Sequence, residues 1–256
     1  MIRRRRSLLA AALALPAARA LAQAAPLTTE EVRRQGFLRI ATTGANAPYT
    51  FVGPDNALQG FDIDWSRAIC AGLGVEPRFA KLEWRGILPG LIAGQFDAVM
   101  SAVRITPERE ATFAFSAPYG TDDVVVIVPA RNATVREIED LRGLTVGAAT
   151  GSVQEQVAKE MANAGTLRSY PGLPDIMLEM RSGRIDAAVV GRGGAAHAIR
   201  TTGAPLRIVG RALQPGPLGM VLRKGSTDLA EAVSAVIAAR RADGAADGDF
   251  ARWFAA

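Results

Sequence analysis

The sequence is poor in the residues that hold small folds together covalently or through metals. Its 256 residues include one cysteine, Cys70, and one histidine, His197. A lone thiol cannot form an internal disulfide, and one Cys with one His cannot supply the four ligands of a structural zinc site. A composition of 49% hydrophobic and 21% charged residues excludes disordered, collagen-like and disulfide-scaffold chains. We therefore expect a globular protein with no metal and no cofactor.

The chain also lacks an apolar run long enough to span a membrane. The nearest approach is at the N-terminus, where four arginines at positions 3–6 precede a short apolar run, 7–15, and small residues stand at positions 20, 22 and 24. This order is typical of a secretory signal peptide. We predict that residues 1–24 are a signal peptide, cleaved after residue 22 or 24, and that the protein is periplasmic. Export by the Sec route or, from the paired arginines, by the twin-arginine route both fit.

The predicted mature chain has no charge excess of either sign. The whole chain has 30 basic and 25 acidic residues, a net charge of +5. The predicted leader contains five arginines and no acid, which leaves 30 − 5 = 25 basic residues against 25 acids. The basic excess therefore belongs to the leader, and we expect no nucleic-acid partner.

Strand-like and helix-like segments alternate along the mature chain. Such alternation predicts mostly parallel sheets flanked by helices, and two rounds of it indicate two lobes. The expected strands are 37–41, 75–79, 97–101, 124–128, 145–148, 167–170, 186–190, 206–209 and 218–222. The expected helices are 64–73, 85–93, a short one from 106, 153–163, 175–181, 228–241 and 249–254.

Several motifs together resemble one family. GFDIDWSRAICAGLG (60–74) closely resembles the signature of the periplasmic amino-acid-type substrate-binding proteins of ABC transporters, family 3. WRGILPGLIAGQFDAVMSAVRITPEREATFAFSAPY (84–119) resembles the ligand segment of that family. The segments 141–155, 182–190 and 246–254 follow in the expected order, so the resemblance covers essentially the whole mature chain.

The resemblance implies a two-lobed periplasmic-binding-protein fold, also called a Venus flytrap. Lobe 1 would comprise residues 25–121 and 221–256, and lobe 2 residues 126–216. Hinge strands near 121–126 and 216–221 would join them. Ligand would close the lobes, and the closed form, expected to be a monomer, would dock on an ABC permease in the membrane.

The same resemblance implies a binding site for a small carboxylate. Arg109 follows the helix-capping Thr106, and the arginine of this motif holds the ligand's α-carboxylate in the family; a guanidinium beside a helix start suits that role. Trp84 would form an aromatic wall. The other expected ligand-binding residues lie at strand ends and helix starts: Thr43, Asn46, Ser101, Ala102, Arg104, Ser152, Val153, Gln154 and Gly191.

Gly191 departs from the family pattern, because amino-acid binders usually have an aspartate there that receives the ligand's α-ammonium. Removing one partner of a buried ion pair costs about 3–5 kcal/mol, roughly two to four orders of magnitude in affinity. An amino acid bound in the usual way would therefore bind badly unless Asp122, Asp123 or Glu155 substitutes.

Arg104 is a second departure, since a Ser or Thr usually occupies that position. The 41 residues from Ala187 to Thr227 also contain six basic residues and no acid. Together these suggest a cleft with surplus positive charge. Two ligand classes stay open: an anion that lacks an α-amine, or an ordinary amino acid with Arg104 turned to solvent.

The leading interpretation is a solute receptor without catalytic residues, feeding an ABC importer or a sensor. The alternative is a cyclohexadienyl dehydratase-like enzyme on the same fold, acting on prephenate or arogenate. That reaction needs a general acid after the lobe 2 strand. The segment VGRGGAAH (190–197) contains no carboxylate.

Overall fold

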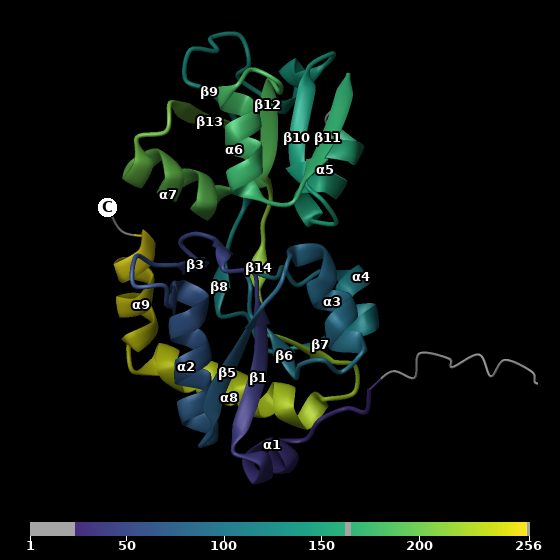
Figure 1. Cartoon of the computed structure of the whole chain (residues 1–256), viewed down its shortest axis with the longest axis vertical. Coiled ribbons are helices and arrows are strands. Elements are labelled where there is room, and N and C mark those ends of the chain that lie inside the picture. Colours follow the sequence, from purple (N-terminus) through teal and green to yellow (C-terminus); the bar gives the residue numbers. More distant parts are fainter. Residues whose placement is uncertain (1–23, 162–164, 255–256) are drawn as a thin grey trace, which may run out of the picture.

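The structure is a computed structural model that describes residues 24–161 and 165–254. Residues 1–23 of the predicted signal peptide lie outside the described residues. The molecule consists of two lobes stacked along its long axis, each built on a five-stranded sheet with helices against it (Figure 1). The first lobe has the strand order β5-β1-β6-β15-β7, and the second has the order β11-β10-β12-β9-β13.

The sheet of the first lobe combines an early segment with a late one. β1 pairs in parallel with β5 and β6, whereas β15 returns from the far end of the sequence and pairs antiparallel with β6 and β7. Its strands are β1 (Phe37–Thr42), β5 (Glu76–Lys81), β6 (Ala98–Val99), β7 (Phe113–Phe115) and β15 (Val221–Arg223). Its helices are α1 (Thr29–Gln35), α2 (Phe61–Leu73), α3 (Trp84–Ile92), α4 (Pro107–Thr112), α8 (Thr227–Ala242) and α9 (Ala245–Phe254).

Helix α2 shows how the sequence fixes this lobe. Phe61, Trp65, Ile69 and Leu73 recur every four residues and are all buried, so they form one apolar stripe against the sheet. Gly74, with φ 76°, ends the helix in the left-handed conformation that glycine adopts without strain.

The second lobe is a continuous piece of chain. β10 pairs in parallel with β11 and β12, and β9 pairs antiparallel with β12 and β13. β9 has the sequence VVVIVP and its five aliphatic residues are buried, as expected for an inner strand covered on both faces. The strands are β9 (Val124–Pro129), β10 (Thr145–Ala149), β11 (Thr166–Tyr170), β12 (Ala187–Gly191) and β13 (Leu206–Gln214). The helices are η1 (Ile138–Leu141), α5 (Val153–Met161), α6 (Leu173–Arg181) and α7 (Arg192–Thr202).

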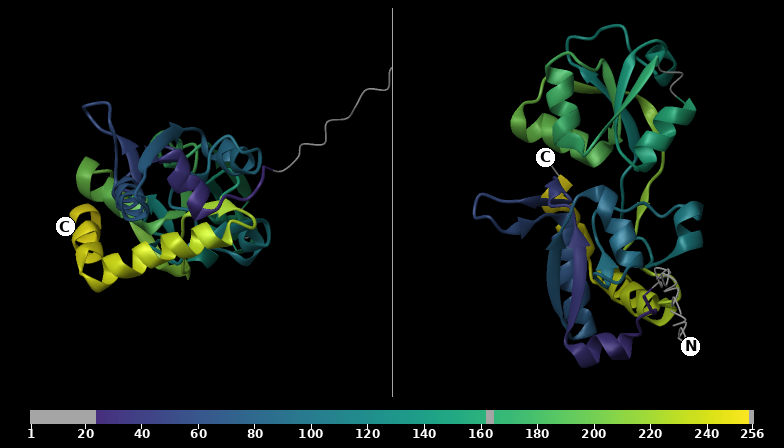
Figure 2. Two further views of the ribbon diagram at one scale, coloured as in Figure 1. Left: turned by 90° about the horizontal axis from the view of Figure 1, so that it is seen from below. Right: turned by 45° about the vertical axis from the view of Figure 1, so that its right-hand side comes forward.

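Two small ladders complete the fold. β8 (Gly120–Thr121) and β14 (Pro217–Leu218) pair antiparallel where the chain passes between the lobes (Figure 1). β2 (Ala45–Asn46), β3 (Thr50–Val52) and β4 (Leu58–Gln59) form a three-stranded sheet on the first lobe. α9 runs up the side of the first lobe, and its C-terminal end lies beside the second lobe (Figure 2).

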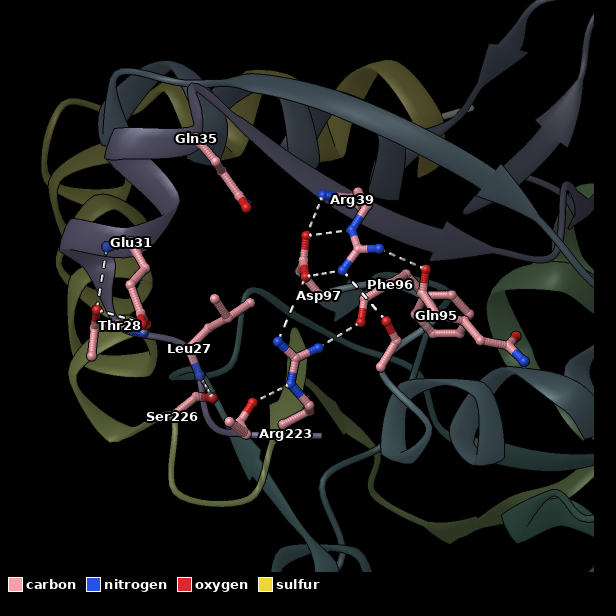
Figure 3. A network of polar contacts seen from close by, with 12 residues as sticks. Leu27, Thr28, Glu31, Gln35, Arg39, Gln95, Phe96, Asp97, Arg223 and Ser226 are labelled. Carbon is pink, nitrogen blue, oxygen red and sulfur yellow. Dashed lines mark hydrogen bonds and ion pairs between the residues drawn. The ribbon is translucent and has the colours of Figure 1, made fainter. Parts of the chain in front are cut away.

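A buried charge network ties the start of the described chain to the first lobe (Figure 3). Asp97 accepts hydrogen bonds from Arg39, with 2.7 Å between Oδ1 and Nη2, and pairs with Arg223 at 3.6 Å. Arg223 also donates to the carbonyl oxygens of Ala25 and Phe96. The N-terminal segment, the first sheet and the late strand β15 are therefore joined around one carboxylate.

The predicted α/β fold with two sheet-containing lobes is confirmed, but the sheets are mixed rather than mostly parallel. In each, two of the four strand pairings are parallel, because the strands that enter or leave the interlobe connections run against their neighbours. The single strand predicted at 218–222 is divided into β14 and β15, which pair in different sheets. Residues 162–163 of the helix predicted at 153–163 lie outside the described residues. No helix in the described ranges is both long and apolar enough to cross a bilayer.

Candidate functional site

A cleft of about 530 Å³ opens between the two lobes. That volume suits a small organic solute. All eleven ligand-binding residues expected from the sequence line this cleft, from both lobes. The fold therefore brings them to one place; their contacts with a ligand stay a prediction.

Arg109 lies in the short helix α4, which begins after Thr106. The Thr106 hydroxyl accepts the backbone N–H of Arg109 at 3.3 Å and so caps the helix. The half-buried guanidinium donates from Nη1 to the carbonyl oxygen of Arg104 at 3.0 Å. Among the described residues, no carboxylate lies within ion-pair distance of it. Burial and the neighbouring Arg104 lower the pKa of Arg109 to about 10, and a bound anion would relieve both effects.

Trp84 places an aromatic surface beside this cation. It is the first residue of α3, and the Arg109 guanidinium carbon lies 5.4 Å from the centroid of its ring. That distance is within the range of a cation–π contact. Trp84 and Arg109 thus form one side of the cleft, with an apolar face next to a positive charge.

Ser101 and Ala102 form a turn that is held in place by hydrogen bonds to Asp62 and Thr43. Ala102 has φ 49°, in the left-handed region that costs a residue with a side chain about 1 kcal/mol or more. The buried Asp62 accepts its backbone N–H at 2.6 Å and accepts the Tyr119 hydroxyl at 2.8 Å. The Ser101 hydroxyl bonds to the backbone N–H and the hydroxyl of Thr43, both at 3.1 Å. Burial raises the pKa of Asp62 to about 7.

The second lobe contributes the start of α5. The Ser152 hydroxyl donates to the Ala149 carbonyl at 2.6 Å and accepts the Glu155 N–H at 3.1 Å. The first-turn N–H groups of a helix have no intrahelical acceptor, so those of Val153 and Gln154 suit an anionic or carbonyl oxygen in the cleft.

Arg104 and Asp122 form a buried ion pair in the lining of the cleft. Nη2 of Arg104 lies 3.0 Å from Oδ2 of Asp122, and each side chain is 5% exposed. The guanidinium also donates to the main-chain carbonyl of Asp122 from Nε at 2.9 Å and from Nη2 at 2.6 Å. Gly216 leaves room for this contact, since a Cβ there would lie 2.4 Å from Nε of Arg104. Oδ1 of Asp122 accepts the N–H of Gly193 at 2.8 Å.

This pair corrects the expectation of surplus positive charge. Arg104 does not turn to solvent, and its charge is balanced by Asp122. The basic residues between Ala187 and Thr227 do not line the cleft. The charged side chains that do line it are three bases and three acids: Lys81, Arg104, Arg109, Glu83, Asp122 and Asp175.

Asp122 is the main residue that sequence reasoning left outside the predicted site. Of the three acids considered as substitutes, only Asp122 lines the cleft. Asp123 lies 3.8 Å from Arg192, and Glu155 accepts bonds from Ser169 and the Gly151 N–H. A second omission is the segment 171–176, whose residues line the cleft from the second lobe. Within the described residues, no three His, Cys, Asp or Glu side chains converge as a metal site would require.

Comparison with known proteins identifies the family. Residues 38–256 match the model of bacterial extracellular solute-binding proteins, family 3. The chain belongs to this family. It is 31% identical to the L-cystine-binding protein TcyJ of Escherichia coli K12, over 88% of this chain and 85% of TcyJ. It is also 31% identical to the histidine-binding periplasmic protein of the same strain, over 81% of this chain and 83% of that protein.

Solved structures agree with this assignment. The ancestral amino acid-binding protein AncCDT-1, described as a precursor of cyclohexadienyl dehydratase, is 33% identical and covers 88% of this chain and 99% of its own, with a TM-score of 0.83. An ancestral arginine-binding protein bound to arginine is 33% identical, with a TM-score of 0.81 over 86% of this chain and 98% of its own. The predicted periplasmic-binding-protein fold and solute-binding function are confirmed.

Proposed function

We propose that this solute-binding protein captures a small carboxylate-bearing solute in the interlobe cleft and delivers it to an ABC permease. The observation that carries the proposal is Arg109, a half-buried cation that lines the cleft and has no carboxylate within ion-pair distance among the described residues. The ligand's carboxylate would accept from its guanidinium in a bidentate arrangement, with Trp84 beside it. Relatives named for cystine, histidine and arginine support a ligand of this kind.

The test uses protein exported from the full chain and recovered from the periplasm. A thermal-shift panel would compare the common L-amino acids and L-cystine with amine-free mono- and dicarboxylates, and calorimetry would give a Kd for each hit. A ligand at about 100 times its Kd adds roughly 2.7 kcal/mol, a shift of several degrees. We expect at least one carboxylate to bind, and we expect no binding of its analogue in which an amide replaces that carboxylate.

Arg109→Met should weaken that binding by about 100-fold or more, because the ligand carboxylate would lose the cation that pairs with it. Arg85→Met is the matched control. Arg85 lies next to Trp84 on α3, but its side chain is 78% exposed and does not line the cleft. Equal affinity of the Arg109 variant and the wild type would rule the proposal out.

We infer that the protein binds its ligand without converting it. A dehydratase would need an acid free to protonate the leaving hydroxyl. The carboxylate of Asp122, the buried acid of the cleft, is already bonded to Arg104 and to the Gly193 N–H. Incubation with prephenate should yield no phenylpyruvate; catalytic turnover would show that the alternative function is the right one.

We also propose that the mature protein is periplasmic and monomeric. The periplasmic relatives and the leader-like residues 1–24 support export. Intact mass of the exported protein should correspond to cleavage after residue 22 or 24, and light scattering should give the mass of a single chain.

A further inference from the structure

Resting on the proposed function, we propose that Asp122 receives the α-ammonium group of the ligand and thereby selects α-amino acids over amine-free acids. Arg104 and the N–H of Gly193 are the positioning groups that hold its carboxylate. The acceptor would thus come from the segment between the lobes rather than from the end of β12.

The first support is steric. Gly191 ends β12 in the cleft, and a Cβ built on it would lie 2.1 Å from Oδ2 of Asp122 and 3.1 Å from its Cγ. No side chain other than hydrogen fits at position 191 while Asp122 holds this conformation. The Asp122 carboxylate therefore occupies the space into which a side chain at the end of β12 would project, and it lines the same cleft.

The second support is the unused bonding capacity of the carboxylate. An ionised carboxylate has about four lone-pair positions. Oδ1 of Asp122 accepts the Gly193 N–H at 2.8 Å, and Oδ2 accepts Nη2 of Arg104 at 3.0 Å. Two further bonds of the Arg104 guanidinium go to the main-chain carbonyl of Asp122. The Tyr49 hydroxyl is a further hydrogen-bond partner of this carboxylate. These contacts anchor the residue without filling all of its lone-pair positions, and Oδ2, on the Gly191 side, has a position left for one more donor.

The third support is the position of the buried charges. Of the three acids that line the cleft, Glu83 and Asp175 are exposed and only Asp122 is buried. A zwitterion with its carboxylate at Arg109 and its ammonium at Asp122 brings each of its own two charges against an opposite buried charge, with the Asp122 carboxylate shared between the ammonium and Arg104. An amine-free acid would satisfy Arg109 but leave Oδ2 of Asp122 removed from water without its second donor, which costs binding free energy.

The experiment compares matched pairs of ligands that differ only in the α-amine. The probes are L-histidine with 3-(imidazol-4-yl)propionate, L-arginine with 5-guanidinopentanoate, L-glutamate with glutarate and L-phenylalanine with 3-phenylpropionate. For every pair in which one member binds the wild type, we expect the amino acid to bind at least about 100-fold more tightly than its partner. An amine-free acid that binds as tightly as its amino acid would overturn the inference.

Asp122→Asn should remove this preference. We expect the affinity for the amino acid to fall by about 100-fold or more and that for the amine-free partner to change by less than about threefold. Asp123→Asn is the matched control, because Asp123 is the adjacent acid but does not line the cleft, and it should bind like the wild type. Unchanged amino-acid affinity in a folded Asp122→Asn protein would overturn the inference.

Because Asp122→Asn leaves the buried Arg104 without its counter-ion, a second variant guards against misfolding. The triple change R104S, D122S and G191D removes the ion pair and moves one carboxylate to the end of β12. It should bind the amino acid within about tenfold of the wild type and keep the preference for the amine. A folded triple variant without that preference would count against Asp122 as the acceptor.

These outcomes separate the two claims. If the amine makes no difference but Arg109→Met abolishes binding, the proposed carboxylate receptor stands and the role of Asp122 is wrong. If no probe and no carboxylate of the panel binds, or if Arg109→Met has no effect, the proposed function itself is wrong.

Discussion

One buried acid behind the cleft lining, Asp62, which accepts the Ala102 N–H, should make the stability of the protein depend on pH. Asp62 is fully buried, and burial raises the pKa of its carboxyl in the folded protein to about 7, against an ordinary 3.8. The protonated carboxyl therefore contributes to the stability of the fold below pH 4, and this contribution is lost as pH rises through 7. The loss is roughly 1–4 kcal/mol at 1.36 kcal/mol per pKa unit. In Asp62→Asn the amide oxygen can still accept the Ala102 N–H, so the free energy of unfolding of this variant should depend less on pH. Chemical denaturation at pH 5 and pH 8 should show the variant gaining stability relative to the wild type; parallel pH profiles would contradict this.

Single residues differ in how far the sequence predicts their place. The family resemblance implied that Arg109 and Trp84 belong to the ligand site, whereas the local pattern indicated only that each lies near the start of a helix. The relation of Asp122 to Gly191 could not be predicted, because it depends on how two distant segments pass each other between the lobes. From the sequence, Gly191 indicates only that no side chain projects from the end of this strand. The structure is needed to see that the Asp122 carboxylate fills the space.

Around the first sheet, one carboxylate joins three elements. Asp97 is 2% exposed and pairs with Arg39 and Arg223, which reach it from β1 and β15 (Figure 3). Asp97→Asn should lower the free energy of unfolding by about 3–5 kcal/mol, since it leaves a buried arginine unpaired. The exposed pair Glu83–Arg85 is the matched control, and Glu83→Gln should cost less than about 1 kcal/mol. Urea denaturation measures the free energy of unfolding of both variants. Equal losses would contradict the claim that the buried Asp97 stabilises the fold more than an exposed ion pair does.

Regular elements were predictable where burial imposes a long pattern. β9 and α2 were expected because five successive buried aliphatic residues, or apolar residues every four positions, allow few other folds. The ladder β2–β3–β4 was missed, since strands of two or three residues leave no period to read. Hinge strands near 121–126 and 216–221 were expected from the family resemblance, but the pairing of β8 with β14 was not. The separation of β14 from β15 lies at Gly219–Met220, where the chain leaves the interlobe ladder and enters the first sheet.

At the scale of the whole molecule, the order of the motifs predicted two lobes. It did not predict the contacts that the lobes make with each other outside the connecting strands. One such contact joins α7 of the second lobe to α9 of the first. Arg200 donates to the carbonyl oxygens of Trp253 at 3.2 Å and Phe254 at 3.4 Å, at the C-terminal end of α9 (Figure 2). Asp64 in turn holds this end, accepting Nε1 of Trp253 at 2.9 Å. The last carbonyls of a helix lack intrahelical partners and carry partial negative charge, so they suit a guanidinium.

Arg200→Met should therefore favour separation of the lobes without touching the cleft, which Arg200 does not line. Two exposed charge-assisted bonds contribute about 1 kcal/mol, so we expect the ligand Kd to rise by about three- to tenfold, with most of the change in the dissociation rate. Arg184→Met is the control, because Arg184 pairs with Glu179 inside the second lobe. Small-angle scattering should show a larger radius of gyration for the ligand-free Arg200 variant than for the control. If the radius and Kd of both variants match the wild type, the contact does not influence how the lobes close, and the connecting strands with the ligand alone govern that motion.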